Sequence, residues 1–74
     1  MYARSAVLIA MQQALDELPT EQREVFVAHE LDGQSFKDIA ARTGVAVNTL
    51  LARKRYAVLS LRARLHTVHA EWDL

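Results

Sequence analysis

Two neighbouring stretches of the chain carry apolar residues at helical spacing. The first is preceded by Ser35, which stands where it can cap a helix, and Asp38 lies where a capping box and the helix dipole favour an acid. Gly44 follows as a stop, because a residue without Cβ readily takes the left-handed conformation of a tight turn. The pattern predicts a helix over residues 35–43. Its apolar face, at i, i+3, i+4 and i+7, consists of Phe36, Ile39, Ala40 and Thr43.

The second stretch begins within four residues of Gly44 and is longer. Its apolar positions keep steps of three or four residues except at Lys54, which predicts the longest helix of the chain, from residue 47 or 48 to beyond residue 65. Two helices joined by so short a turn pack at a steep angle and project the second one outward. Residues 35–56 are therefore predicted to form a helix-turn-helix, with a recognition helix over about residues 47–65. The apolar positions of this helix are Val47, Leu50, Ala57, Leu61, Leu65 and Val68.

Two further helices are predicted before the motif. The first covers residues 4–17 and ends at Leu18, because a residue that precedes a proline is pushed out of the helical region. The second covers residues 20–31, with Thr20 as its expected cap, Glu21 and Glu24 in its first turn, and the pair at residues 32–33 as its stop.

These elements predict an all-α fold, a small four-helix domain occupying residues 1–74. The 74 residues are 51% hydrophobic, with only two glycines and one proline, and no stretch alternates with a two-residue period. The absence of cysteine excludes a disulfide scaffold and a thiolate metal site, and it is compatible with a reducing cytoplasm. The apolar run over residues 6–11 is too short to span a membrane, so no membrane association is expected.

The charge is divided along the chain although the net charge is zero. Residues 16–38 hold seven acids and two bases, whereas residues 42–64 hold six bases and no acid. Such a division can be a pair of ordinary solvated faces. Its coincidence with the second helix of a helix-turn-helix favours DNA as the partner of the positive side.

Three sequence blocks, in this order, resemble a known family. They are Leu-Pro-Thr-Glu-Gln-Arg-Glu-Val-Phe over residues 18–26, Gly-Gln-Ser over residues 33–35 followed by Ile39-Ala40, and Gly44 with Thr49 and Arg53. Over about residues 12–65 the chain resembles region 4, the C-terminal DNA-binding domain, of bacterial extracytoplasmic-function sigma factors.

The resemblance implies a cytoplasmic protein whose last helix lies in the major groove of the promoter −35 element. It also implies contact with the β flap of the RNA polymerase core, and an anti-sigma factor often holds this domain. Gln22 and Arg23 are placed near DNA or polymerase by this analogy alone.

The chain departs from the family pattern inside its recognition helix. Ala46 replaces the usual capping serine, which leaves Asn48 or Thr49 to take over the cap. Leu51, Ala52 and Tyr56 stand where a basic residue, serine and arginine are commoner in the family.

Candidate contacts follow from residue chemistry. At least two of Arg53, Lys54 and Arg55 are assigned to phosphates, because they point about 100° apart around the helix. The stem of Lys54 is expected along the core with its ammonium group reaching outward. Leu51 and Ala52 can touch only a thymine methyl or fill space. Tyr56 either donates a hydrogen bond to a phosphate or packs on the second helix. The complete predicted DNA-binding set is Arg42, Asn48, Thr49, Ala52, Arg53, Lys54, Arg55 and Tyr56.

No catalytic or metal site is predicted, and neither a cofactor nor a small-molecule substrate is expected. No nucleophile, base and orienting group can be placed together, and no phosphate-binding glycine loop is present. His66 and His69, with Glu71 and Asp73 nearby, lack the further ligands that a closed metal site requires, so they are interpreted as a polar continuation of the last helix. Trp72 is expected to pack that tail or to belong to a partner interface.

Two other functions remain open from the sequence. The first is a sigma-like protein-interaction domain that binds an anti-sigma factor or polymerase without reading DNA, an alternative that Leu51, Ala52 and Tyr56 support. The second is the DNA-binding output domain of a response regulator, against which the Leu-Pro block at residues 18–24 argues modestly.

Overall fold

The computed structural model describes the backbone of residues 2–72 and the side chains of residue 6 and residues 8–66. The described part is all-helical, which confirms the predicted fold class. Its elements are α1 (Tyr2–Asp16), α2 (Thr20–Phe26), the π-helical turn η1 (Val27–Leu31), α3 (Phe36–Thr43) and α4 (Val47–Trp72). None of the described helices combines the length and the apolar character needed to cross a membrane.

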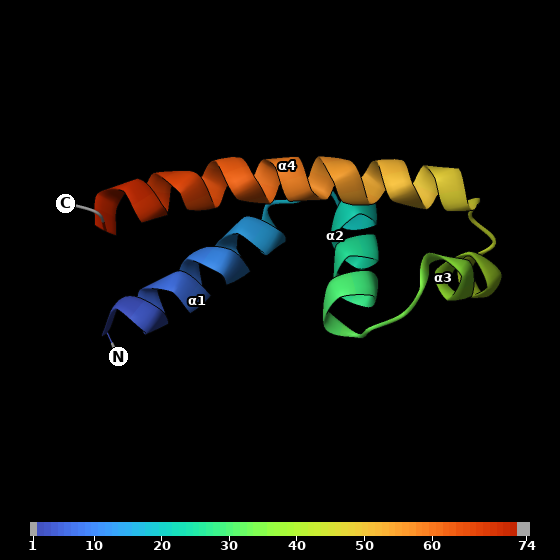
Figure 1. Ribbon diagram of the computed structural model, residues 1–74, viewed down its shortest axis with the longest axis horizontal. Helices are drawn as coiled ribbons and strands as arrows, with labels where there is room; N and C mark the ends of the chain where they lie inside the picture. The colour runs from blue at the N-terminus through green and yellow to red at the C-terminus, as the bar shows by residue number, and fades with distance from the viewer. Residues whose placement is uncertain (1, 73–74) are drawn as a thin grey trace.

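Helix α4 runs along the length of an elongated molecule, and the other helices pack against it (Figure 1). The domain measures 45 × 20 × 16 Å, and the 26 residues of α4 extend along its longest dimension. α1 packs against the C-terminal part of α4, α2 crosses beneath its middle, and α3 lies beside its beginning. The first part of α4 therefore projects beside α3, away from the end where α1 starts.

Two buried clusters hold the helices together. One joins α1 and α2 to α4 and consists of Ala14, Leu18, Phe26, Ala57 and Leu61. The other joins α2, η1, α3 and α4 and consists of Val25, Ala28, Ile39 and Leu50. The predicted apolar positions of α3 and α4 supply Ile39, Leu50, Ala57 and Leu61, so the predicted helix register is confirmed.

The two ends of α3 form as the sequence predicts. The Ser35 hydroxyl accepts a hydrogen bond of 3.0 Å from the backbone N–H of Asp38, which caps the helix. Gly44 lies at φ 75° in the left-handed region, and its N–H donates to the Ala40 carbonyl at 2.8 Å. The Ser35 cap and the left-handed Gly44 limit α3 to eight residues and begin the short turn to α4.

Three details differ from the sequence predictions. Thr20 does not cap α2: the N-cap is Pro19, whose extended backbone leaves its carbonyl to accept from the N–H groups of Gln22 and Arg23. The predicted helix over residues 20–31 changes to π geometry at Val27. α4 begins at Val47, so Asn48 and Thr49 lie inside its first turn and do not replace the missing cap.

Candidate nucleic-acid interface

One side of the first half of α4 is uncovered. Because successive residues turn by about 100°, it lies opposite the buried Leu50, Ala57 and Leu61. Leu51 is 46% exposed, Tyr56 59% and Leu59 47%. We call this surface the outer face; it consists of Asn48, Leu51, Ala52, Arg55, Tyr56 and Leu59.

The amino end of α4 adds polar groups beside the outer face. Asn48 and Thr49 are exposed in the first turn, and neither side chain has a hydrogen-bond partner among the described residues. The first intrahelical bond runs from the Leu50 N–H to the Ala46 carbonyl at 3.1 Å. No side chain of the described residues caps the backbone N–H groups of residues 47–49. A helix end with such free N–H groups favours the binding of an anion.

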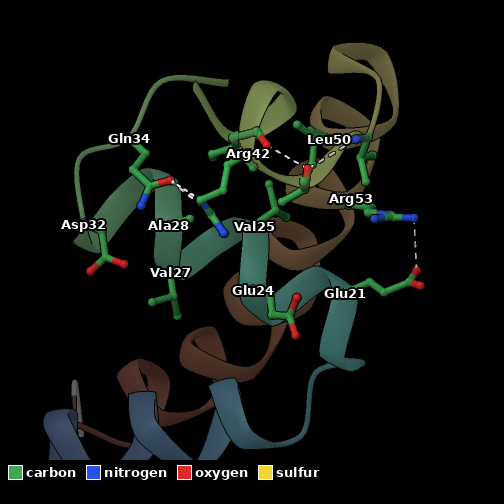
Figure 2. Close-up of a pocket in the computed structure, with 13 residues that line it drawn as sticks. Glu21, Glu24, Val25, Val27, Ala28, Asp32, Gln34, Arg42, Leu50 and Arg53 are labelled. Carbon is green, nitrogen blue, oxygen red and sulfur yellow. Dashed lines mark hydrogen bonds and ion pairs between the residues drawn. The ribbon is translucent and has the colours of Figure 1, made fainter. Parts of the chain in front are cut away.

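Arg53 points away from the outer face. Its guanidinium Nη2 lies 3.4 Å from the Glu21 carboxylate at the start of α2, and its side chain is 30% exposed (Figure 2). The pair ties α4 to α2. The sequence contained both residues, but nothing in their spacing indicated that they would meet.

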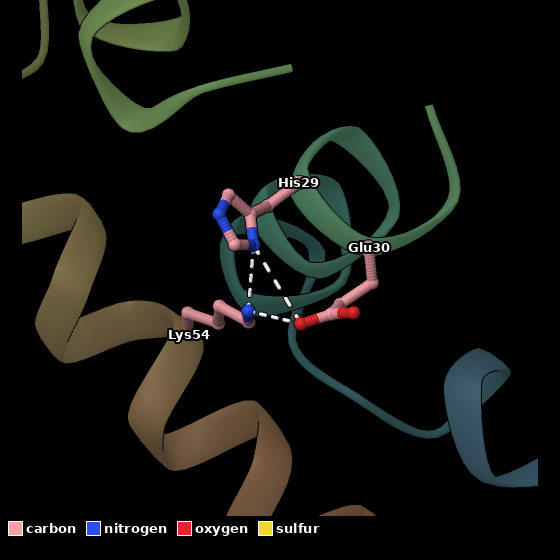
Figure 3. Close-up of polar contacts among 3 residues, drawn as sticks. All are labelled: His29, Glu30 and Lys54. Atoms are coloured by element: carbon pink, nitrogen blue, oxygen red, sulfur yellow. Dashed lines mark hydrogen bonds and ion pairs between the residues drawn. The ribbon is translucent and has the colours of Figure 1, made fainter. Parts of the chain in front are cut away.

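Lys54 is also turned inward. Its ammonium group donates to Glu30 and lies 2.6 Å from Nδ1 of His29, and only 15% of its side chain is exposed (Figure 3). The hydrogen bond and charge of Lys54 lower the pKa of the Glu30 carboxyl. The stem lies along the core as predicted, but the ammonium group ends on an acid of η1 instead of on the outer face.

The π turn brings this acid to α4. The Asp32 N–H donates to the Val27 carbonyl, five residues back, and the Gln34 N–H donates to the Ala28 carbonyl. His29 stacks on Phe36 of α3, with ring centroids 4.1 Å apart. His29 thus contacts both helices of the motif, a role that no apolar period in the sequence could reveal.

Arg42 lies on a different surface from the outer face. Its Nε and Nη2 donate to Oε1 of Gln34 at 3.3 and 3.0 Å (Figure 2). It lines a groove of about 560 Å³ between α2, η1, α3 and the start of α4, where Arg53 also lies. Three carboxylates share this groove, which makes it a poor site for a phosphate: Glu21, Glu24 and Asp32.

The structure therefore divides the predicted contact set. Five members lie on the outer face or at its amino end: Asn48, Thr49, Ala52, Arg55 and Tyr56. Arg42 and Arg53 line the acidic groove, and the ammonium group of Lys54 is paired with Glu30.

A basic groove extends the outer face along α4. It has a volume of about 550 Å³, and every charged residue that lines it is a cation. Arg62 belongs to this groove, seven residues after Arg55 and on nearly the same side of the helix. Sequence reasoning missed Arg62, although this spacing was a usable signal. The lining consists of Phe36, Leu51, Lys54, Arg55, Val58, Leu59 and Arg62.

A second groove, mainly apolar, lies between α1 and the later part of α4. It measures about 440 Å³ and continues from Val58 and Arg62 toward the C-terminal end of α4. Leu8 and Ile9 on α1 are more than half exposed. The apolar lining consists of Met11, Phe26, Val58, Leu61 and Leu65.

Within the described residues, no three potential metal ligands gather. His66 is exposed. The predictions for His69, Glu71, Trp72 and Asp73 fall outside the described side chains.

Comparison with known proteins supports the resemblance. The family model described as "Sigma-70, region 4" matches residues 8–61. The chain is 41% identical over 58 residues to the ECF RNA polymerase sigma factor EcfG of Rhodopseudomonas palustris (strain TIE-1), an alignment that covers 78% of this chain and 32% of the relative. It is 43% identical over 63 residues to the ECF RNA polymerase sigma factor SigM of Mycobacterium tuberculosis, covering 85% of this chain and 30% of the relative.

The chain thus spans about a third of the length of these curated relatives. No solved structure matches it significantly. The family match covers the second part of α1, then α2, η1 and α3, and α4 as far as Leu61, so it includes the whole helix-turn-helix. On these grounds the chain belongs to the sigma-70 region 4 family, as a region 4 domain of the ECF sigma factor type.

Proposed function

We propose that this chain is the promoter-binding module of a sigma factor, that it acts in the cytoplasm, and that the outer face of α4 reads the −35 element during transcription initiation. The observation that carries the proposal is the distribution of charge on α4. No acid occurs between residues 39 and 70, so the part of α4 that faces outward carries no group that would repel a phosphate.

The pairing of the cations sharpens this argument. Arg53, Lys54 and Arg64 form ion pairs with Glu21, Glu30 and Glu17, respectively. Arg55 and Arg62 have no acidic partner among the described residues, and both line the basic groove. We therefore assign phosphate contact to these two arginines and leave the three paired cations out of the proposed contact set.

A salt titration with matched arginine variants tests this assignment. Duplex binding, followed by fluorescence anisotropy, should weaken with rising salt, and Arg55→Ala should reduce the log–log slope by about 0.9, the value for one phosphate contact. Arg64→Ala is the control, because Arg64 lies on the same helix but is held by Glu17 at 2.6 Å. Equal slopes for the parent and Arg55→Ala would remove Arg55 from the interface.

We further propose that the apolar groove between α1 and α4 receives the β flap of RNA polymerase. Its lining is mainly apolar, and although it meets the basic groove at Val58 and Arg62, Met11, Phe26 and Leu65 lie outside that groove, so one domain could hold polymerase and DNA together. Leu65→Lys should weaken binding to purified RNA polymerase core and leave duplex affinity unchanged. Leu31→Lys changes an exposed leucine outside the groove and serves as the control. Parallel loss of both activities in Leu65→Lys would point to misfolding, which circular dichroism would detect.

A second function has specific support from the outer face. Leu51, Tyr56 and Leu59 each expose a large apolar side chain on the outer face, and exposed apolar surface is more typical of a protein interface than of a phosphate-binding surface. In that case an anti-sigma factor or polymerase would cover the outer face without DNA. Absence of salt-dependent duplex binding by the parent would favour this function over DNA reading.

A further inference from the structure

The outer face presents hydrocarbon where a DNA-reading helix commonly presents hydrogen-bonding groups. Leu51 and Ala52 occupy the second turn of α4, and both are exposed. Neither side chain can donate or accept a hydrogen bond at a base edge. If the outer face lies in a major groove, as proposed above, these two residues must recognise something other than a donor or an acceptor.

The position of the pair suits contact with bases. The N-terminal turns of a recognition helix reach the base edges in the major groove. Arg55 follows Leu51 by one turn on the same side, and Arg62 continues this row in the basic groove. Because both arginines lie on the C-terminal side of Leu51 and no acid interrupts the row, phosphate contacts by these arginines would hold the second turn of α4, and Leu51 with it, close to the base edges.

Only one feature of the major groove is apolar, and it is the C5-methyl group of thymine. We infer that Leu51 and Ala52 select thymine through this methyl group, so that the domain takes duplex DNA with thymines opposite the second turn of α4. Leu59 lies eight residues after Leu51, about 12 Å further along the helix, and is therefore excluded from this contact. The inference rests on the proposed DNA-binding function.

Replacing thymine by deoxyuridine tests the inference directly, because it removes the methyl group and keeps every donor and acceptor. The probes are two A·T-rich duplexes of one sequence, without self-complementary repeats, one with thymine and the other with deoxyuridine. The parent should bind the thymine duplex more tightly, by about fourfold for each methyl group contacted, since one buried carbon contributes about 0.8 kcal/mol. A G·C-rich duplex should gain affinity when its cytosines carry a C5-methyl group.

Two leucine variants assign the preference to a side chain. Leu51→Ala should reduce the ratio of thymine to deoxyuridine affinity, whereas Leu31→Ala should retain it, because Leu31 is 62% exposed but lies on η1. The comparison of ratios removes any effect of deoxyuridine on DNA flexibility, which all variants share.

The outcomes separate the inference from the function beneath it. Equal affinity of the parent for both duplexes, or an unchanged ratio in Leu51→Ala, would overturn methyl recognition while DNA binding stands. Absence of salt-dependent binding to any of the duplexes would overturn the DNA-binding function itself.

Discussion

Truncation of Ile39 is expected to destabilise the helix-turn-helix strongly. Ile39 is 2% exposed and packs with Val25, Ala28 and Leu50 in the cluster that joins α3 to the rest of the domain. Ile39→Ala removes three carbons, which at about 0.8 kcal/mol each gives about 2.4 kcal/mol of lost transfer free energy. The cavity left behind adds to this, so the free energy of unfolding should fall by roughly 2 to 5 kcal/mol.

This loss is large for a domain of 74 residues. At roughly 0.05 to 0.15 kcal/mol per residue, the total free energy of unfolding is about 4 to 11 kcal/mol. Ile39→Ala should therefore leave a marginal fold, with a Tm lower by about 10 °C or more.

Urea unfolding followed by circular dichroism would measure the change, with Leu31→Ala as an exposed control expected to lose less than about 0.5 kcal/mol. A loss below about 1 kcal/mol in Ile39→Ala would refute the packing argument, because a side chain that is only 2% exposed could then be truncated without the expected cost.

Three further substitutions test local features of the fold. Ser35→Ala should lower the free energy of unfolding by about 1 kcal/mol, because it removes the cap on the Asp38 N–H. Ser35→Gly should lower it by only a few tenths of a kcal/mol. Equal losses for the two variants in urea unfolding would contradict the capping role. Gly44→Ala should cost roughly 1 to 2 kcal/mol, because φ is 75° there, and an unchanged urea midpoint would show that the turn relaxes. The pKa of Glu30 is lowered by Lys54, so the stability that this carboxylate contributes should be present above its unfolded pKa near 4.5 and lost as pH falls through its lower folded pKa. The difference in urea midpoint between the parent and Glu30→Gln should therefore shrink as the pH drops below about 4.5, and a difference that is constant with pH would contradict this assignment.

The features that the sequence predicted correctly depend on neighbouring residues. The Ser35 cap acts on a group three residues away, and the Gly44 stop acts within its own turn. Ile39 and Leu50 were identified as core positions because burial on one helix face follows the helical period. Three short sequence blocks, between residues 18 and 53, then identified the sigma-factor family by resemblance.

The features that the sequence could not supply depend on contacts between distant residues. Lys54 meets Glu30 across 24 positions, and Glu30 lies in η1, where the Asp32 N–H donates to the Val27 carbonyl five residues back. Arg53 meets Glu21 across 32 positions. Both cations were predicted to contact DNA from their place in an Arg-Lys-Arg run, but spacing alone cannot tell which member of a run faces an acid and which faces solvent.

The most direct test of the account is a backbone amide NMR titration of the domain with duplex DNA at low and moderate salt. The account predicts salt-sensitive shifts on the outer face of α4, centred on Asn48, Leu51, Ala52 and Arg55, with little change along the apolar groove at Met11 and Leu65. Shifts confined to that apolar groove, or no shifts on the outer face even at low salt, would contradict the claim that this face binds DNA.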